Sequence, residues 1–172
     1  DTVTITALKP DLRVSSIISP SSACILSSTQ QVQVEIENVG TDTIFIGQTI
    51  NVSYEINDVL QQTQGITLTQ KFFPGQKLTH TFTKTSDMSG VGTYIIKSYT
   101  TYSGDLNPFN NTATKTVITL GIPTVDIGPD RGVCSGSSLT LDAGNLGATY
   151  LWSTSATTQT INVNSAGTYS VT

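Results

Sequence analysis

A Gly-Thr-Tyr triplet occurs at two places in the chain, Gly92–Tyr94 and Gly167–Tyr169, and small residues precede it both times. In β-sandwiches, a tyrosine near the start of a late strand can donate its hydroxyl to the backbone just upstream and pin the corner where the chain changes sheet. Both stretches fit such a corner, because the small residues permit a tight turn and the tyrosine is the first large side chain. The triplet therefore predicts two β-sandwich modules in series.

A second aromatic residue supports each module. Tyr54 alternates with Val52 and Ile56, and Trp152 lies in the stretch 149–153, where a central strand would place its core aromatic residue. The rest of the chain has short alternating stretches and no helical period. We predict an all-β fold of serial immunoglobulin-like β-sandwiches. The strands expected in the first module are 12–14, 32–37, 50–56, 66–73, 78–83, 94–102 and 113–120.

Turn signals divide the 172 residues into three parts. Residues 1–8 alternate apolar residues with threonine and are interpreted as the closing strand of a preceding module. Residues 9–120 form the first sandwich, and residues 121–172 begin a second one at Gly121-Ile122-Pro123. The strands expected in the second module are 139–141, 150–152, 161–163 and 169–171. This module lacks its last strand, which leaves an edge unpaired, and a strand like residues 1–8 is what it lacks.

Hydroxyl groups dominate the expected surface. The chain has 30 threonines and 19 serines against 20 charged residues, so hydroxyls cover the outward faces of the strands. The net charge is −4 and the basic residues are scattered, which disfavours nucleic acid as a partner, because its binding needs a concentrated basic patch. No apolar stretch approaches the ~20 residues of a membrane span. We expect no membrane insertion, and an extracellular or outer-surface location.

The two cysteines, Cys24 and Cys134, belong to different modules. A disulfide between them would require the modules to fold back on one another across a short linker. In an exported chain, a single thiol indicates either a partner outside this sequence or a buried unpaired cysteine. The residues themselves leave both alternatives open.

Four stretches of the first module, at 19–26, 32–40, 92–94 and 105–111, resemble CARDB-like modules, the cell-adhesion-related domains of bacterial surface proteins. The resemblance implies a structural or adhesive role. It implies no catalytic residue, because such modules have none.

Five stretches of the second module carry a more specific resemblance, because several fixed spacings agree at once. They are Val125–Asp130, Cys134–Gly136, Leu139–Gly144, Tyr150–Ser153 and Gly167–Tyr169. They resemble the PKD-like or Ig-like repeats of large Bacteroidetes surface adhesins, including gliding-motility adhesins, which leave the cell by type IX secretion. The resemblance implies a disulfide partner for Cys134 beyond residue 172.

Three features have the form of catalytic motifs, and each has a simpler structural explanation. Gly132–Gly136 has the spacing of a nucleophile elbow with cysteine, but no helix follows it and the only histidine, His80, lies in the other module. His80 alternates with apolar residues, so we expect its ring at the core rim with one nitrogen hydrogen-bonded. Glu35 and Glu37 share a strand face that we expect to be solvated, unlike the facing carboxyls of a glycosidase. We predict no enzyme activity and no cofactor.

Two groups of oxygen-bearing side chains are candidate ligands for structural calcium. Asp126, Asp130 and Asp142 lie at or near the junction of the modules, where a shared ion would stiffen a stalk. Asp105 and Asn107 begin a loop in the manner of a calcium loop, but its later glycine and glutamate are missing. Ordinary turns require the same residue types, and that is the alternative explanation for both groups.

Tyr99, Tyr102 and Phe109 lie on or near one loop and are candidates for stacking on sugar rings. The alternative is that Tyr99 and Phe109 cap the end of the sandwich. The sequence as a whole predicts a non-catalytic spacer and adhesive stalk of a large secreted or cell-surface bacterial protein. Its expected partners are neighbouring Ig-like modules and extracellular polysaccharide. A carbohydrate-binding module, or an accessory region of a secreted polysaccharide hydrolase, is the competing interpretation.

Overall fold

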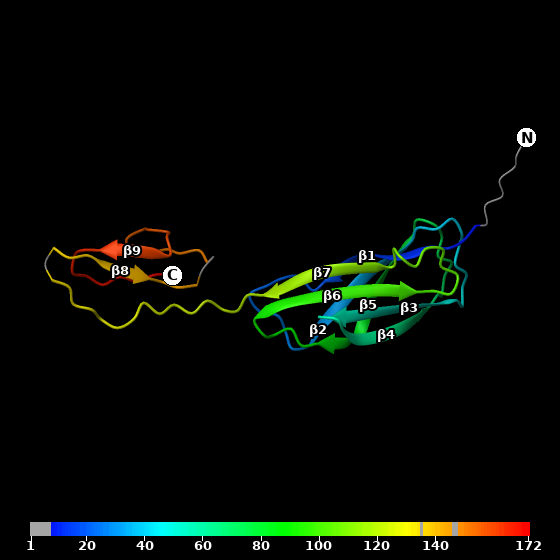
Figure 1. Ribbon diagram of the computed structural model, residues 1–172, viewed down its shortest axis with the longest axis horizontal. Coiled ribbons are helices and arrows are strands. Elements are labelled where there is room, and N and C mark those ends of the chain that lie inside the picture. The colour runs from blue at the N-terminus through cyan, green and yellow to red at the C-terminus, as the bar shows by residue number, and fades with distance from the viewer. Residues whose placement is uncertain (1–7, 135, 146–147) are drawn as a thin grey trace, which may run out of the picture. The chain divides into compact units, whose positions relative to one another are not determined.

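Nine β-strands are the only regular secondary structure in residues 8–134, 136–145 and 148–172, which are the residues that the computed structural model describes. The predicted all-β class is therefore confirmed for this part of the chain. The strands divide between two units, Asp1–Gly121 and Ile122–Thr172 (Figure 1). The strand predicted at residues 1–8 falls on residues 1–7, which lie outside the described residues. No helix capable of crossing a membrane is found within the described ranges.

The seven strands of unit 1 form two antiparallel sheets that pack into a β-sandwich (Figure 1). One sheet has the strand order β1-β2-β5 and the other has the order β4-β3-β6-β7. The sandwich predicted for the first module is present. The strand bounds are β1 Leu12–Ser19, β2 Gln30–Asn38, β3 Thr49–Ile56, β4 Val59–Thr67, β5 Lys77–Ser86, β6 Gly92–Thr101 and β7 Thr112–Thr119.

Strict alternation on β2 shows how the sequence builds the core. Val32, Val34 and Ile36 are fully buried, whereas Glu35 and Glu37 point to the opposite face. In a strand, successive side chains point to opposite faces, so this pattern buries one face of the sheet against the other sheet. Each fully buried aliphatic side chain contributes about 1.5–3 kcal/mol relative to an exposed one. The burial predicted from alternation is confirmed for this strand.

Tyr54 is the central aromatic residue of this core, as predicted. Its side chain is fully buried and its ring centroid lies 4.5 Å from that of Phe82. The Tyr54 hydroxyl donates to the carbonyl oxygen of Lys84 (3.0 Å), so the buried polar group is satisfied. The contact joins β3 in one sheet to β5 in the other.

Both predicted tyrosine corners are formed. The hydroxyl of Tyr94 donates to the carbonyl oxygen of Gly90 at 2.8 Å. The hydroxyl of Tyr169 donates to the carbonyl oxygen of Ser165 at 2.9 Å. In each case the acceptor lies four residues upstream, so both units contain the same tyrosine-corner hydrogen bond.

β4 differs from the strand predicted at 66–73. β4 ends at Thr67, and Phe72 makes only an isolated bridge to Ile44. None of the nine residues of β4 is fully buried, because β4 is an edge strand of its sheet. The sequence of β4 has no regular apolar alternation, so its bounds could not be predicted from the pattern of apolar residues.

Two edges of the sandwich are covered by the chain itself. On β5, the backbone N–H of Lys84 donates to Oε1 of Gln62 (2.8 Å) and that of Thr83 to Oε1 of Gln64 (3.4 Å), so side-chain amides take the place of a neighbouring strand. Along the end of β7, the segment 22–24 pairs in parallel through Ala23. Covered edges are closed to pairing with a further chain.

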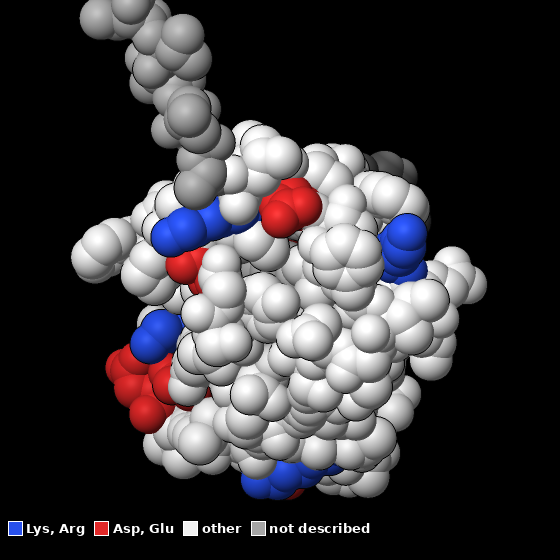
Figure 2. All heavy atoms as spheres, turned by 90° about the vertical axis from the view of Figure 1, so that its right-hand side faces the viewer, with Lys and Arg blue, Asp and Glu red and all other residues white. Residues whose placement is uncertain are grey.

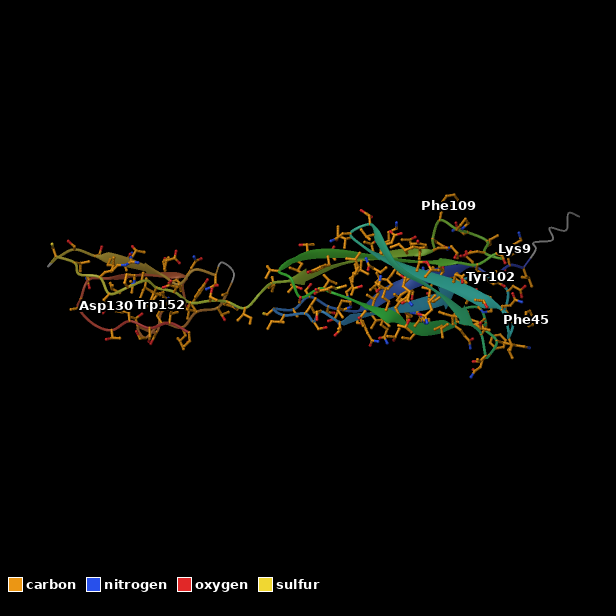
Figure 3. All side chains as sticks on the ribbon, turned by 90° about the horizontal axis from the view of Figure 1, so that it is seen from below. Lys9, Phe45, Tyr102, Phe109, Asp130 and Trp152 are labelled. Carbon is orange, nitrogen blue, oxygen red and sulfur yellow. The ribbon has the colours of Figure 1, made fainter. Side chains whose placement is uncertain are left out.

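Unit 2 is built on one two-stranded sheet, β8 Leu139–Asp142 paired with β9 Thr160–Val163. Its buried apolar residues are Leu141, Ala143 and Trp152, of which Trp152 is labelled in Figure 3. Trp152 is 2% exposed and donates its indole N–H to the carbonyl oxygen of Thr158 at 2.8 Å, so its predicted place in the core is confirmed. The sandwich predicted for this unit stays a prediction, because one two-stranded sheet does not establish it.

The strands predicted at 150–152 and 169–171 are present only as a short antiparallel pairing around a single bridge between Trp152 and Val171. Leu151 and Thr172 exchange backbone hydrogen bonds of 2.8 and 3.0 Å, and the N–H of Ser153 donates to the carbonyl oxygen of Ser170 (2.8 Å). The backbone N–H of Trp152 points to the other side and donates to the carbonyl oxygen of Ala156 (2.9 Å), which closes a turn. The pairing therefore does not extend past Ser153.

Candidate binding surface

Three loops meet at one end of unit 1: residues 39–48 between β2 and β3, 68–76 between β4 and β5, and 102–111 between β6 and β7. Ile44 and Phe72 exchange two backbone hydrogen bonds of 3.0 and 2.9 Å, which join the first two loops. In sandwiches of immunoglobulin type, loops gathered at one end are the usual binding surface. This end faces the viewer in Figure 2, where Lys and Arg occupy separate positions and most of the surface is uncharged.

Asn38 at the end of β2 holds two of these loops to the start of β1. Its side chain is fully buried. Its Nδ2 donates to the carbonyl oxygens of Asp42 (2.9 Å) and Phe72 (3.1 Å). Its Oδ1 accepts from the backbone N–H of Gly40 (3.1 Å) and Asp11 (3.4 Å). One buried amide therefore satisfies backbone groups from several segments, which fixes the loop end without secondary structure.

Exposed aromatic side chains stand on each of the three loops. Phe109 is 95% exposed, Phe45 56% and Phe73 47%. We call these three residues the loop-end aromatic face; Figure 3 labels Phe45 and Phe109 on opposite sides of this part of unit 1, so the rings are separate contact points. The ammonium of Lys71 lies 5.6 Å from the centroid of the Phe45 ring, within reach of a cation–π interaction. Together these rings offer flat apolar surfaces in solvent.

The sequence did not identify Phe45 and Phe73 as surface residues. The signal for Phe73 was the Phe72-Phe73 pair, since adjacent residues of an extended segment point in opposite directions. Phe72 is 5% exposed and packs in the core, so Phe73 must point outward. Phe45 stands next to Ile44, which is 1% exposed, in the same way.

The predicted aromatic trio does not form one platform. Tyr102 packs against the core, over Gly104, where a Cβ atom would lie only 2.8 Å from the ring. Tyr99 lies half-buried on β6, with the ammonium of Lys97 5.7 Å from its ring centroid. Phe109 alone stands free in solvent. The alternative in which Phe109 caps the sandwich is wrong, because a capping residue would be covered.

Asp105 and Asn107 shape the loop that presents Phe109. Oδ1 of Asp105 accepts from the backbone N–H of Asn107 (3.1 Å), and its Oδ2 accepts from Nδ2 of Asn111 (2.9 Å). Oδ1 of Asn107 accepts from the backbone N–H of Phe109 (3.3 Å). These are the bonds of successive Asx turns. Calcium at this loop stays a prediction.

Asp126, Asp130 and Asp142 lie in unit 2. Asp126 accepts from the backbone N–H of Gly128 (2.8 Å), and Asp130 is exposed (Figure 3). The backbone N–H of Gly144, together with the side chain of Gln159, holds the pKa of Asp142 below its ordinary value. Within the described ranges no three His, Cys, Asp or Glu side chains gather as a metal-holding group. Calcium at these aspartates stays a prediction.

Glu35 and Glu37 lie on the outer face of β2 and are ion-paired. Glu35 lies 2.8 Å from the ammonium of Lys77, and Glu37 lies 2.9 Å from the guanidinium of Arg13. Hydrogen bonds from Lys77 and from Ser15 lower the pKa of Glu35. A general acid needs a carboxyl whose pKa is raised, so this pair has the wrong electrostatics for glycoside hydrolysis.

Cys24 and Cys134 are both exposed, and neither forms a disulfide within the described part of the chain. The alternative of a buried unpaired cysteine is therefore wrong for both. Cys134 and the single histidine lie in different units. No described base accompanies the Gly132–Gly136 turn.

His80 lies on β5 at the rim of the core, with its ring edge-on to Phe82 at a centroid distance of 5.0 Å. The expected hydrogen bond is absent at Nε2, which is buried without a partner among the described residues. The strand neighbour of His80 is Val34, which offers no polar side chain. Burial lowers the pKa of His80 from its ordinary value of 6.5.

We expect the stability of unit 1 to fall as the pH is lowered from about 7 to about 5. The unfolded chain binds a proton on His80 more readily than the folded one, so stability is full above the unfolded pKa and declines as the pH falls towards the lowered folded pKa. Urea unfolding followed by circular dichroism at several pH values measures this decline. The variant His80→Leu, in which no histidine remains, should lose the slope. If His80→Leu kept the same dependence of stability on pH, carboxyl groups rather than His80 would be its cause.

Comparisons with known proteins bear on the fold. No family model and no curated protein sequence matches this chain. Among solved structures, the crystal structure of a CARDB domain from Pyrococcus furiosus, in complex with di-metal ions, aligns with a TM-score of 0.52. The alignment has 23% identity and covers 69% of this chain and 100% of that chain. Unit 1 has a CARDB-like β-sandwich fold.

Two further structures resemble the CARDB-like fold more distantly. The solution structure of the same Pyrococcus furiosus domain aligns with a TM-score of 0.41 at 24% identity, over 66% of this chain and 99% of that chain. The archaellum periplasmic stator protein FlaG from Sulfolobus acidocaldarius aligns with a TM-score of 0.35 at 19% identity, over 62% and 98%. The resemblance of unit 1 to CARDB-like modules is confirmed as a likeness of fold. The PKD-like resemblance of unit 2, and the link to type IX secretion, stay predictions.

Proposed function

We propose that this chain is a non-catalytic adhesive spacer of a secreted or cell-surface protein, and that its CARDB-like unit contacts extracellular polysaccharide through the loop-end aromatic face. Phe109 carries this proposal. It is 95% exposed, yet its loop is fixed by the hydrogen bonds of Asp105 and Asn107. An ordered loop that holds a large apolar ring in solvent is the arrangement expected of a contact residue.

Polysaccharide is the ligand class that this surface fits best. Sugar rings present flat C–H faces that stack on aromatic side chains, and they need no strong charge. Three exposed phenylalanines on neighbouring loops provide such surfaces, and the charged groups at this end are dispersed (Figure 2). No catalytic role is proposed, because Glu35 and Glu37 are neutralised by ion pairs.

The cellular setting is part of the proposal. The hydroxyl-rich surface favours an extracellular location. The spacings of residues 125–169 support a large bacterial surface adhesin exported by type IX secretion, in which serial modules hold a terminal unit away from the cell. An adhesin of the gliding-motility class is consistent with this setting.

Binding of the chain to a panel of polysaccharides, with calcium and with chelator, tests the proposal. We expect saturable binding to at least one polysaccharide and a loss of about fivefold or more in affinity for Phe109→Ala, because a stacked ring is worth about 1 kcal/mol beyond its buried area. Leu120→Ala is the matched control, since Leu120 is 65% exposed but follows β7 at its far end. If Phe109→Ala bound polysaccharide as tightly as the wild type, the loop-end aromatic face would not be the binding surface. If the wild type bound no polysaccharide, only the spacer role would remain.

A further inference from the structure

The first and last strands of unit 1 run side by side. β1 and β7 are edge strands of different sheets, and they border one another along one side of the sandwich (Figure 1). The chain continues this border past the end of β1, where residues 22–24 pair with the end of β7 through Ala23. We call the border between residues 14–24 and 111–121 the β1/β7 seam.

Hydrogen bonds cross the seam along its whole length. They run from the N–H of Val14 to the carbonyl oxygen of Asn111 (3.3 Å), from Nζ of Lys115 to the carbonyl oxygen of Ile18 (3.0 Å), from the N–H of Ile118 to Oγ of Ser22 (2.9 Å), from the N–H of Ala23 to the carbonyl oxygen of Ile118 (3.1 Å), from the N–H of Leu120 to the carbonyl oxygen of Ala23 (3.0 Å) and from the N–H of Gly121 to the carbonyl oxygen of Cys24 (2.8 Å). Residue numbers rise together on the two sides, so the two segments are parallel. The buried hydroxyl of Thr119 also donates to the carbonyl oxygen of Met88 (2.8 Å), which fixes the end of β7.

The seam lies between the two points where tension along the chain enters unit 1. The preceding residues join β1 at its start, Leu12, and the following residues leave β7 at its end, Thr119. Because the two strands are parallel, these points lie at opposite ends of the sandwich. Tension therefore slides β1 along β7 and stretches all bonds of the seam at the same time. A pull at right angles to the strands would instead break such bonds one after another.

The two antiparallel ladders next to the seam are stretched in the same way. β1 pairs with β2, and β7 pairs with β6, along most of their lengths. Hydrogen bonds between antiparallel strands lie across the strand direction, so sliding either strand stretches its ladder as a whole. Neither strand can leave the sandwich under tension without breaking the seam together with its ladder.

The opposite border of the sandwich, between β4 and β5, lies away from this path. There the Nε2 of Gln62 donates to Oγ1 of Thr83 (2.8 Å), and its Oε1 accepts from the N–H of Lys84 (2.8 Å). Neither β4 nor β5 is joined directly to the incoming or the outgoing chain. The bonds of this border therefore carry little of the tension until the seam has opened.

We propose that unit 1 is a force-resisting module, in which the β1/β7 seam keeps the sandwich folded under tension along the chain. The use of this property in the cell rests on the proposed spacer role, because an adhesive contact transmits tension to the chain that carries it. The property itself needs no polysaccharide. Unfolding under force is governed by the rate of unfolding, so the lifetime of the folded unit at constant force is the quantity that the seam should control.

Single-molecule force spectroscopy of the full chain, held by its two termini at constant force, measures this lifetime. The length released on unfolding distinguishes the units, because unit 1 has more than twice as many residues as unit 2. Ser22→Ala together with Leu120→Pro removes two hydrogen bonds of the seam, those donated by the N–H groups of Ile118 and Leu120. Ser22 is exposed and Leu120 is 65% exposed, so neither change disturbs the core.

Gln62→Ala is the matched control, because it also removes two hydrogen bonds but at the border that lies off the path of tension. Without force, urea unfolding should show a similar loss of stability in the two variants. At constant force, the lifetime of unit 1 should fall about tenfold in the seam variant and less than about twofold in Gln62→Ala. Ser22→Ala alone, which places no strain on the backbone, should shorten the lifetime about threefold.

Two results would overturn the proposal. One is a seam variant, or Ser22→Ala alone, whose lifetime at constant force equals that of the wild type. The other is an equal shortening in the seam variant and in Gln62→Ala, which would show that the lifetime follows overall stability and not the position of the bonds. Because the force measurement uses no ligand, a failure of polysaccharide binding would reject the adhesive contact and leave the role of the seam standing.

Discussion

Replacing Asn38 by alanine is expected to lower the free energy of unfolding of the CARDB-like unit by about 3 kcal/mol. The buried amide makes four hydrogen bonds, and without it the carbonyls of Asp42 and Phe72 and the N–H groups of Gly40 and Asp11 lose a partner. Each polar group left buried and unsatisfied costs roughly 1–3 kcal/mol, although the loops will relax to reach water. Urea unfolding followed by far-ultraviolet circular dichroism measures the change.

Asn51→Ala is the matched control, because Asn51 is exposed on β3 and its loss should change stability by less than about 0.5 kcal/mol. Trp152 fluorescence should show that unit 2 is unaffected by either variant. The loops of Phe45 and Phe73 are those that Asn38 holds, so polysaccharide binding should weaken in Asn38→Ala even while the unit stays folded. Stability equal to that of Asn51→Ala would show that water replaces the amide without cost.

The inside and outside of the central strands could be predicted because alternation is a local property. On β2 and β5, residues two apart share a face whatever their partners are, so Val34 and Phe82 were placed in the core by sequence alone. The two tyrosine corners are local in the same sense, since each hydroxyl bonds four residues upstream. The overall likeness of fold to CARDB domains follows from such local signals.

The binding surface could be predicted only in part, because it depends on pairing between distant segments. Phe109 was identified from its loop, but Phe45 and Phe73 are turned outward by the bridge between Ile44 and Phe72, which no local pattern encodes. Tyr102 was predicted to be available and is instead packed over Gly104. Exposure in loops is decided by tertiary contacts, whereas exposure in regular strands is decided by position.

Unit 2 shows the same division between local and long-range information. β8 and β9 were predicted from their apolar residues, whereas the strand expected at Trp152 is limited to the pairing of residues 151–153 with 170–172, because a turn closed by Ala156 follows.

Trp152→Ala is expected to unfold unit 2 and leave the CARDB-like unit intact. Removing a buried tryptophan costs about 3–5 kcal/mol, through lost burial and the cavity that remains. Trp152 is by far the largest of the three buried apolar residues of unit 2, beside Leu141 and Ala143. A unit this small buries too little surface to tolerate such a loss. In amide correlation spectra, the dispersed signals of residues 122–172 should collapse while those of unit 1 keep their positions.

Leu151→Ala is the control for this variant, because Leu151 precedes Trp152 directly but is 57% exposed. Its spectrum should match that of the wild type. Trp152→Phe should fall between the two, since the ring still packs but the hydrogen bond from the indole N–H to Thr158 is lost. If unit 2 stayed folded in Trp152→Ala, the expectation would be wrong, and interactions outside the core of Leu141, Ala143 and Trp152 would be the main source of its stability.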